Sequence, residues 1–325
     1  MKRVLKVFIS FAVASAGVSN GVLAQSKASI KILNQFQAHN LTGESLIQVH
    51  YSPTSTNFIT AASDGRVKVW AEPRKLTAEF SHNPPAMLFN GRLETDNKTL
   101  VTAAYNGVAT RWSTLGTSPQ NYGPHLSGVT DVEILPGNDG VITTSDDGSI
   151  RFWTIDGRLV KRIERQGVAR NLALAKQRKL VAVTQDMGNV TIVSTTGAML
   201  QAFKTNQGRL NDVIFSPDEK LVITTGFDGS IKIWALGDLK LSPKLQTTIQ
   251  ASQTGWINGL ALNQAGVLAS VSDDGRVRLW TLSGKELATL ALSDKHLLSC
   301  SFSPDGKKLL VATQNGTISE LEVNP

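Results

Sequence analysis

The chain has 325 residues, of which 41% are hydrophobic and 18% are charged. This composition is typical of a globular protein with a large core, and it excludes a disordered or fibrous chain. The formal net charge is +7, but the basic residues are spread along the chain without a basic run, so binding to nucleic acid is not expected.

The first 24 residues have the features of an export signal. Basic residues come first, residues 7–18 are apolar, and small residues lead up to Ala24. The apolar stretch is shorter than the roughly 20 residues of a membrane-spanning helix, so no stable membrane anchor is expected. We therefore predict cleavage after Ala24 and an exported mature protein, either periplasmic or extracellular. An uncleaved first strand is the alternative.

From residue 29 onwards, a nine-residue phrase recurs. Its five clearest copies are ASDGRVKVW (62–70), AYNGVATRW (104–112), SDDGSIRFW (145–153), GFDGSIKIW (226–234) and SDDGRVRLW (272–280). Two weaker copies are QDMGNVTIV (185–193) and TQNGTISEL (313–321). Consecutive glycines of the phrase lie 40 to 46 residues apart, at Gly65, Gly107, Gly148, Gly188, Gly229, Gly275 and Gly316. Seven copies at this spacing indicate a repeat architecture.

Each repeat is predicted to contain four strands. A β-rich run such as residues 221–225 precedes the phrase and an apolar–polar alternation follows its glycine, which is the pattern of a hairpin with a tight turn. An earlier strand ends in Ser-Pro-Asp, as at residues 216–218 and 303–305, and a more polar segment follows the tryptophan. The pattern predicts an all-β, seven-bladed β-propeller of four-stranded antiparallel blades.

The two ends of the repeat array predict how the ring closes. The last repeat stops after residues 317–323 and lacks a fourth strand, whereas residues 29–36 precede the first complete repeat. We expect residues 29–36 to pair with the last blade, because this pairing removes two exposed sheet edges. Residues 25–325 are then a single domain, and we expect it to be monomeric.

The repeats resemble those of the WD-repeat family of β-propellers over residues 30–323, although other residues follow the tryptophan where the family has aspartate. The resemblance implies a structural hydrogen-bond relay in each blade, made by a His, a Ser or Thr, the turn Asp and the Trp. The matching residues are His39, Thr60, Asp64 and Trp70 in the first blade; His82, Thr102 and Trp112 in the second; His125, Thr143, Asp147 and Trp153 in the third; Thr224, Asp228 and Trp234 in the fifth; and Ser270, Asp274 and Trp280 in the sixth. In the second blade, Asn106 replaces the aspartate.

The adjacent carboxylates Asp273 and Asp274 raise the question of acid–base or metal chemistry. Asp274 matches the turn aspartate of other repeats, whereas the position of Asp273 is occupied by Phe227 in another repeat. We therefore predict that Asp274 holds its turn and that Asp273 is mostly solvated. Searches for nucleophile, zinc, phosphate-loop and EF-hand motifs find none, so no catalytic residue, metal or cofactor is predicted.

Cys300 is the single cysteine of the chain. It lies in the apolar alternation LLSCSF, which favours a buried structural thiol over a reactive or dimer-forming one.

The family resemblance also implies that partners bind at the narrower top face, near the loops that precede each first strand. Trp256 lies in such a loop and is the one tryptophan of six that does not end a repeat phrase; Arg209 and His296 occupy matching places. Aromatic residues and arginine are enriched at binding hot spots. The predicted partner-binding residues are Trp256, Arg209, Asn211, Asn258, Arg170 and His296. The alternative for Trp256 is packing over its own blade.

Two classes of function remain. The sequence favours a non-enzymatic exported scaffold that binds a protein or peptide through its top-face loops, because nearly the whole chain is blade and no catalytic constellation departs from the repeat. The alternative is an exported propeller hydrolase or carbohydrate-binding module with a pocket at the channel mouth. The connection at residues 235–256, which is longer than its counterparts and leads to Trp256, is the first place to look for specificity.

Overall fold

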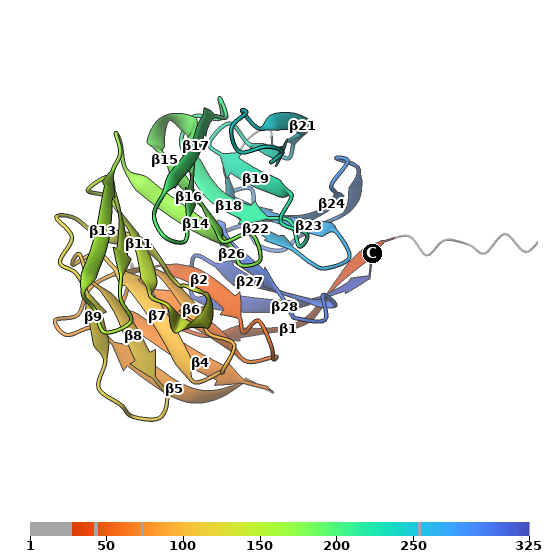
Figure 1. Ribbon diagram of the computed structural model, residues 1–325. Coiled ribbons are helices and arrows are strands. Elements are labelled where there is room, and N and C mark those ends of the chain that lie inside the picture. The colour runs from red at the N-terminus through yellow and green to blue at the C-terminus, as the bar shows by residue number, and fades with distance from the viewer. Residues whose placement is uncertain (1–27, 42–44, 73, 253–254, 325) are drawn as a thin grey trace, which may run out of the picture.

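A computed structural model describes residues 28–41, 45–72, 74–252 and 255–324. These residues form seven four-stranded antiparallel sheets arranged around a central channel (Figure 1). The predicted all-β, seven-bladed propeller is therefore confirmed. The predicted signal segment, residues 1–24, lies outside the described residues. No helix in the described ranges is long and apolar enough to cross a membrane.

The blades follow one another along the chain, and each runs from its innermost to its outermost strand. Blades one to three contain β2 (Leu46–Tyr51), β3 (Phe58–Ala62), β4 (Arg66–Ala71) and β5 (Lys75–Ser81); β6 (Leu88–Leu93), β7 (Thr99–Ala104), β8 (Ala109–Ser113) and β9 (Gln120–Tyr122); and β10 (Val129–Ile134), β11 (Val141–Ser145), β12 (Ser149–Trp153) and β13 (Leu159–Glu164). Two 3₁₀ turns, η1 (Pro136–Asn138) and η2 (Asp186–Gly188), connect strands in blades three and four.

The remaining blades repeat the same order, except that the last blade takes its outer strand from the other end of the chain. Blades four to seven contain β14 (Ala169–Ala175), β15 (Leu180–Gln185), β16 (Asn189–Ser194) and β17 (Met199–Lys204); β18 (Leu210–Phe215), β19 (Leu221–Gly226), β20 (Ser230–Ala235) and β21 (Lys244–Gln250); β22 (Ile257–Leu262), β23 (Val267–Ser272), β24 (Arg276–Thr281) and β25 (Glu286–Ala291); and β26 (Leu297–Phe302), β27 (Lys308–Thr313), β28 (Thr317–Asn324) and β1 (Ser29–Gln37).

The N-terminal strand closes the ring, as expected. β1 pairs antiparallel with β28 from Ser29 opposite Asn324 to Gln37 opposite Thr317, and the red and blue strands lie side by side in Figure 1. Ion pairs then join blade seven to blade one across the seam, since Arg74 lies 3.3 Å from Glu320. The pairing covers the outer edge of β28 and gives blade seven four strands, as in the other blades.

The apolar core lies between neighbouring blades. The cluster that joins the first two blades, for example, combines Ile59 and Val67 of blade one with Leu88 and Leu100 of blade two, all at most 1% exposed. This packing follows from the two-residue period of a strand, because each sheet turns alternate side chains toward the blades on its two sides. Cys300 is also buried, in β26.

The turn glycines of the repeat phrase are required by their backbone conformation. Gly275 has φ of 72°, and a Cβ at this position would lie only 1.8 Å from the carbonyl oxygen of Ser293. Any other residue would be strained and would displace the chain. The weaker repeat in blade four forms the 3₁₀ turn η2, in which Met187 also has a positive φ of 66°.

All seven innermost strands share one irregularity that places equivalent residues on the channel. In each of them the pairing register shifts just after the first residue, for example between Leu210 and Asp212 in β18 and between Leu88 and Asn90 in β6. Such a bulge re-aims the side chains that follow it. Positions in different blades can therefore be matched one to one.

Candidate functional site

The top-face residues lie where two loops of every blade meet. The backbone N–H of the first residue in each second-to-third-strand turn donates a hydrogen bond to the carbonyl of the residue just before the innermost strand. The seven donor and acceptor pairs, 2.8 to 3.1 Å apart, are Ser63 and Ser45, Tyr105 and Met87, Asp146 and Gly128, Asp186 and Val168, Phe227 and Arg209, Asp273 and Trp256, and Gln314 and His296. Arg209, Trp256 and His296 therefore occupy equivalent positions in blades five, six and seven.

Trp256 is part of a stack of three side chains. Its ring lies parallel to that of Phe227, with centroids 4.0 Å apart and planes at 8°. The guanidinium carbon of Arg209 lies 4.9 Å from the centroid of the same phenylalanine. Trp256 remains 46% exposed. It thus packs on the turn of blade five while presenting much of its surface to solvent.

Arg170 joins two turns on this face. Its Nε lies 3.1 Å from Asp186, and its guanidinium also lies 3.4 Å from Asp146 in the preceding blade. Burial raises the pKa of Asp146 above its ordinary value, although the positive charge of Arg170 partly opposes this rise. Arg170 is therefore held between two carboxylates.

The two asparagines link neighbouring blades. Asn211 donates to the carbonyl of Ile257 at 3.0 Å, and Asn258 donates to the carbonyl of Leu297 at 2.9 Å. Asn211 lies with Arg170, Arg209, Trp256 and His296 on one arc of the top face, from blade four to blade seven, whereas Asn258 also lines the channel cavity.

The structure corrects the prediction for Asp273. Its carboxylate accepts a hydrogen bond from Asn258 at 2.6 Å and lies 2.9 Å from the Nδ1 of His296, and its side chain is only 20% exposed. Asp273 was predicted to be mostly solvated, which is wrong because the neighbouring blade brings His296 to it. A contact between blades cannot be read from a single repeat.

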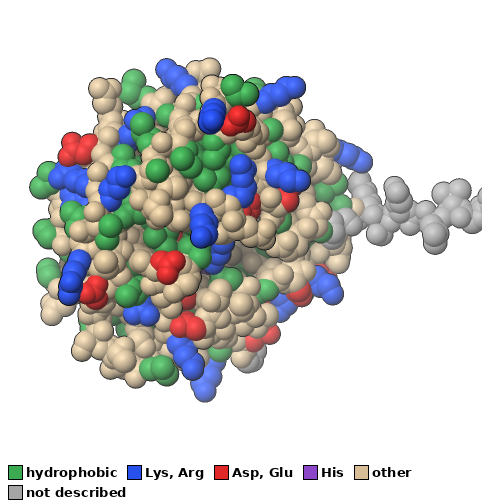
Figure 2. Space-filling model, viewed as in Figure 1, with side chains coloured by type: hydrophobic (Ala, Val, Ile, Leu, Met, Phe, Trp, Pro, Cys, Tyr) green, Lys and Arg blue, Asp and Glu red, His purple; other side chains and the backbone are tan. Residues whose placement is uncertain are grey.

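Further large apolar side chains are exposed on the same face. Tyr105 and Met187 lie in second-to-third-strand turns, Leu126 precedes β10, and they are 60%, 71% and 82% exposed. Exposed apolar residues that gather on one face commonly mark an interaction site. In the view of Figure 2, by contrast, Lys and Arg are scattered and form no single basic area.

The relay residues of the first blade are hydrogen-bonded to one another. The ring of His39 lies between two partners, with Nδ1 at 3.2 Å from Asp64 and Nε2 at 2.9 Å from the hydroxyl of Thr60. Trp70 donates to the same hydroxyl at 3.0 Å. Both ring nitrogens of His39 and the indole N–H of Trp70 therefore have partners within the blade, as buried polar groups require.

The third blade has the same arrangement, and in addition the hydroxyl of Ser149 donates a hydrogen bond to Asp147. His125 lies 2.8 Å from the hydroxyl of Thr143, which also accepts from Trp153 at 2.9 Å, and 3.3 Å from the carboxylate of Asp147. Although burial opposes it, hydrogen bonds from Ser149 and from a backbone N–H hold the pKa of Asp147 well below its usual range. This carboxylate is charged and engaged in its turn.

The second blade lacks the turn carboxylate. His82 lies 2.7 Å from the hydroxyl of Thr102, to which Trp112 donates at 2.8 Å. Asn106 instead accepts from the backbone N–H of Val108. Burial lowers the pKa of His82 to about 4, so its ring is neutral at neutral pH.

In the fifth blade a glutamine takes the place of the histidine. Gln207 accepts from the hydroxyl of Thr224 at 2.6 Å and donates to Ser230, which in turn donates to Asp228. Trp234 donates to Thr224 at 3.1 Å. The role of Gln207 was not predicted from the sequence, because the family's relay has a histidine at this place.

The sixth blade lacks the histidine, and an arginine contacts its turn aspartate. Trp280 donates to Ser270 at 2.9 Å, and Arg278 lies 2.5 Å from Asp274. Although burial opposes it, hydrogen bonds from Arg278 and Ser272 lower the pKa of Asp274 below its ordinary value. Asp274 is thus held within its own hairpin.

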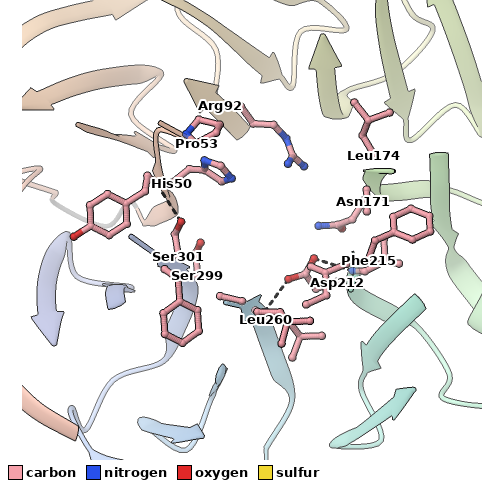
Figure 3. Close-up of a pocket in the computed structure, with 18 of the residues that line it drawn as sticks. His50, Pro53, Arg92, Asn171, Leu174, Asp212, Phe215, Leu260, Ser299 and Ser301 are labelled. Carbon is pink, nitrogen blue, oxygen red and sulfur yellow. Dashed lines mark hydrogen bonds between the residues drawn. The ribbon is translucent and has the colours of Figure 1, made fainter. Parts of the chain in front are cut away.

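A cavity of about 570 Å³ occupies the channel (Figure 3), and the loops in its lining place it toward the end opposite the top face. It is lined by the innermost strands and the loops that follow them. In this cavity Arg92 is paired with two carboxylates, at 3.0 Å from Asp131 and 3.2 Å from Glu133. Burial, followed by the charge of Arg92, lowers the pKa of His50 to about 4.

The cavity offers no metal site among the described side chains, since no group of three or more His, Cys, Asp or Glu is placed to hold an ion. Its volume lies within the range of about 300 to 1,000 Å³ that is usual for small-molecule sites. The individual lining residues could not be predicted from the sequence, because they come from all seven repeats.

Comparison with known proteins agrees with the repeat pattern. The family model for the WD domain, G-beta repeat, matches residues 30–71, 116–154, 197–235, 243–281 and 284–319. The chain is similar to an uncharacterized WD repeat-containing protein of Synechocystis sp., with 39% identity over 92% of this chain and 88% of the relative. It is also similar to a second WD repeat-containing protein of Synechocystis, at 32% identity over 94% and 91% of the two chains. Rat WD repeat-containing protein 1 is 25% identical over 47% of this chain and 26% of its own length.

Proposed function

Because the chain belongs to the WD-repeat family, whose propellers generally act as scaffolds for protein interactions, we propose that it is an exported, non-enzymatic scaffold. In this proposal the top face binds a protein or peptide partner. The blades serve as a rigid support that holds the binding loops in place.

The stack of Arg209, Phe227 and Trp256 is the observation that carries this proposal. It combines a half-exposed indole with a guanidinium, which is the composition of an interface hot spot. The backbone hydrogen bond between Asp273 and Trp256 fixes the loop to its turn, so little entropy is lost when a partner binds.

The remaining predicted residues support a polar rim around this stack. Arg170 and His296 are held by carboxylates of neighbouring turns, and Asn211 and Asn258 by backbone carbonyls. A hydrophobic centre with a polar border is the usual arrangement of a protein–protein interface.

Crosslinking in the compartment where the protein resides tests the proposal. The double variant Trp256→Ala/Arg209→Ala is expected to lose the partner while remaining folded. A matched control, Leu159→Ala/Lys161→Ala, removes an exposed apolar and a basic side chain from the outer strand β13 and should retain it. Equal recovery by both folded variants would contradict the top-face assignment.

The alternative proposal is an exported hydrolase or carbohydrate-binding module that uses the channel mouth. Turnover of a panel of hydrolase substrates, or saturable binding of an oligosaccharide that does not depend on Trp256, would support it over the scaffold.

Export is supported by the sequence of residues 1–24 alone. Cell fractionation followed by mass measurement of the intact protein tests it. We expect a chain that begins at Gln25 outside the cytoplasm; a full-length chain in the cytoplasm would contradict export.

A further inference from the structure

The described lining of the channel cavity contains more acidic than basic side chains, although the whole chain has a positive formal charge. Its described lining includes four acidic and two basic side chains: Glu94, Glu133, Asp212 and Glu219, and Arg92 and Lys176. We propose that the cavity binds a linear aliphatic polyamine, whose ammonium groups pair with Asp212 and Glu94 and whose methylene chain lies along the apolar side of the channel. This site is separate from the top face and does not depend on its function.

Asp212 differs from its counterpart Asp131 in one respect that matters for a cation. Both accept a hydrogen bond from the backbone N–H of the next blade, at 2.8 Å from Leu260 and 2.9 Å from Leu172. Asp131 is also neutralised by Arg92, at 3.0 Å. Asp212 has no cation within 4.0 Å in the part of the chain that the structure describes, and the hydrogen bonds of its carboxylate come from two backbone N–H groups.

Glu94 is the second carboxyl without a partner. Within the described ranges its side chain makes neither a hydrogen bond nor an ion pair, and it lines the cavity from the loop after β6. It lies four residues beyond Asn90, whose position in β6 corresponds to that of Asp212 in β18. Four residues of strand span about 13 Å, so the two carboxyls face the channel at different depths. A ligand with two separated cations suits such a pair.

Burial is the main cause of a raised pKa in both carboxyls. Burial, aided by Asp131 and opposed by Arg92 and two backbone N–H groups, raises the pKa of Asp212 to about 7. Burial, aided by Glu133 and Asp96 and opposed by Lys176 and Arg92, raises the pKa of Glu94 to about 7. An ammonium group placed beside each would stabilise the ionised form.

The side of the channel that is formed by blades four, five and six carries apolar side chains near Asp212. Two residues beyond the level of Asp212, the innermost strands carry Ala173, Ile214 and Ala261 in blades four, five and six, whereas blades one, two, three and seven carry polar side chains. Figure 3 shows Phe215 and Leu260 beside Asp212, on the side of the cavity away from His50. Methylene groups of a polyamine would bury against this side while its ammonium groups meet the carboxyls.

Isothermal titration calorimetry with spermidine tests the proposal on the purified protein. At about pH 8 we expect saturable binding to one site, weakened about tenfold or more by Glu94→Gln and by Asp212→Asn. The side chain of Glu94 makes no hydrogen bond with another described residue, so this variant remains informative if Asp212→Asn does not fold. Binding should weaken as the pH falls from about 8 to 5.5, since both carboxyls become protonated while the amines stay charged.

Matched controls distinguish binding of spermidine in the cavity from non-specific electrostatic attraction of a cation to the protein. Asp218→Asn removes a carboxylate from an exposed loop at the same end of the propeller and should leave the affinity unchanged. Trp256→Ala should also leave it unchanged, and the neutral 1,4-butanediol should not bind. Absence of saturable spermidine binding, or an equal loss in Glu94→Gln and Asp218→Asn, would overturn the proposal.

Discussion

Trp256 of blade six stacks face to face on Phe227 of blade five, with ring centroids 4.0 Å apart. The two residues stand at different steps of the repeat, one before an innermost strand and one in a hairpin turn. Their contact joins adjacent blades at the top face and places an exposed indole on a fixed support. The position of this half-exposed indole is therefore set by a pair of residues rather than by one.

This contact should be measurable as an energetic coupling. Trp256→Ala and Phe227→Ala are each expected to destabilise the protein modestly, and the double variant by less than their sum. A coupling of about 0.5 to 1.5 kcal/mol in urea unfolding is the size expected for a stacked aromatic pair. Strict additivity would show that the two rings do not stabilise each other in solution.

Removal of residues 25–38 should destabilise the whole ring. The deletion takes away β1, which pairs with β28 along its length, and leaves blade seven with an unpaired edge. We expect the Tm to fall by on the order of 10 °C, measured by circular dichroism. Removal of residues 25–28 alone keeps β1 and serves as the control. An unchanged Tm after the longer deletion would contradict closure by this strand.

The buried histidines predict a loss of stability in acid. Burial lowers the pKa of His82 and of His125 to about 4, below the unfolded value of about 6.5. Between about pH 4 and 6.5, the unfolded chain therefore binds more protons than the folded chain. The contribution of these two histidines to the free energy of unfolding is fully present above about pH 6.5. It should decrease as the pH falls from about 6.5 to 4.

A glutamine variant isolates this effect. Gln207 already makes the corresponding hydrogen bond to Thr224 in blade five, so His82→Gln has a precedent within the same chain. Thermal unfolding of this variant should depend less steeply on pH between about 4 and 6.5 than that of the unmodified protein. The same slope in both proteins would exclude His82 as a source of the acid sensitivity.

Asp274 and Asp273 should respond differently to substitution. Asp274→Ala removes the partner of Arg278 and Ser272 in a partly buried hairpin, and we expect a loss of about 1 to 3 kcal/mol in the free energy of unfolding. Asp273→Ala should cost less stability, because its contacts to Asn258 and His296 lie nearer the surface. Urea titration of both variants checks this order, and a larger loss for Asp273→Ala would reverse it.

The sequence predicts the features that recur from blade to blade and the way in which the ring closes. The spacing of the glycines, the alternation after them and the extra strand at residues 29–36 follow local rules, and all of them appear in the structure. It also identifies Arg209, Trp256 and His296 as equivalent positions, which the backbone hydrogen bonds confirm.

The features that sequence could not predict arise between blades. Phe227 and Tyr105 are the two aromatic residues at a turn position that other repeats fill with Ser, Asp or Gln, but the role of Phe227 needs the neighbouring blade to bring Trp256 onto it. The unneutralised Asp212 can be recognised only by comparison with Asp131, which has Arg92 beside it. Both the contact of Phe227 with Trp256 and the absence of a cation beside Asp212 among the described side chains depend on how separate repeats pack against one another.

Site-specific photo-crosslinking is the most direct test of the proposed interaction surface. A photoreactive phenylalanine analogue would be placed at Tyr105 on the top face and, separately, at Leu159 on the outer strand, positions that are 60% and 50% exposed. We predict a discrete crosslinked partner from Tyr105 that disappears when Trp256→Ala is added, and none from Leu159. A partner captured from Leu159 alone, or a Tyr105 adduct unaffected by Trp256→Ala, would contradict the account.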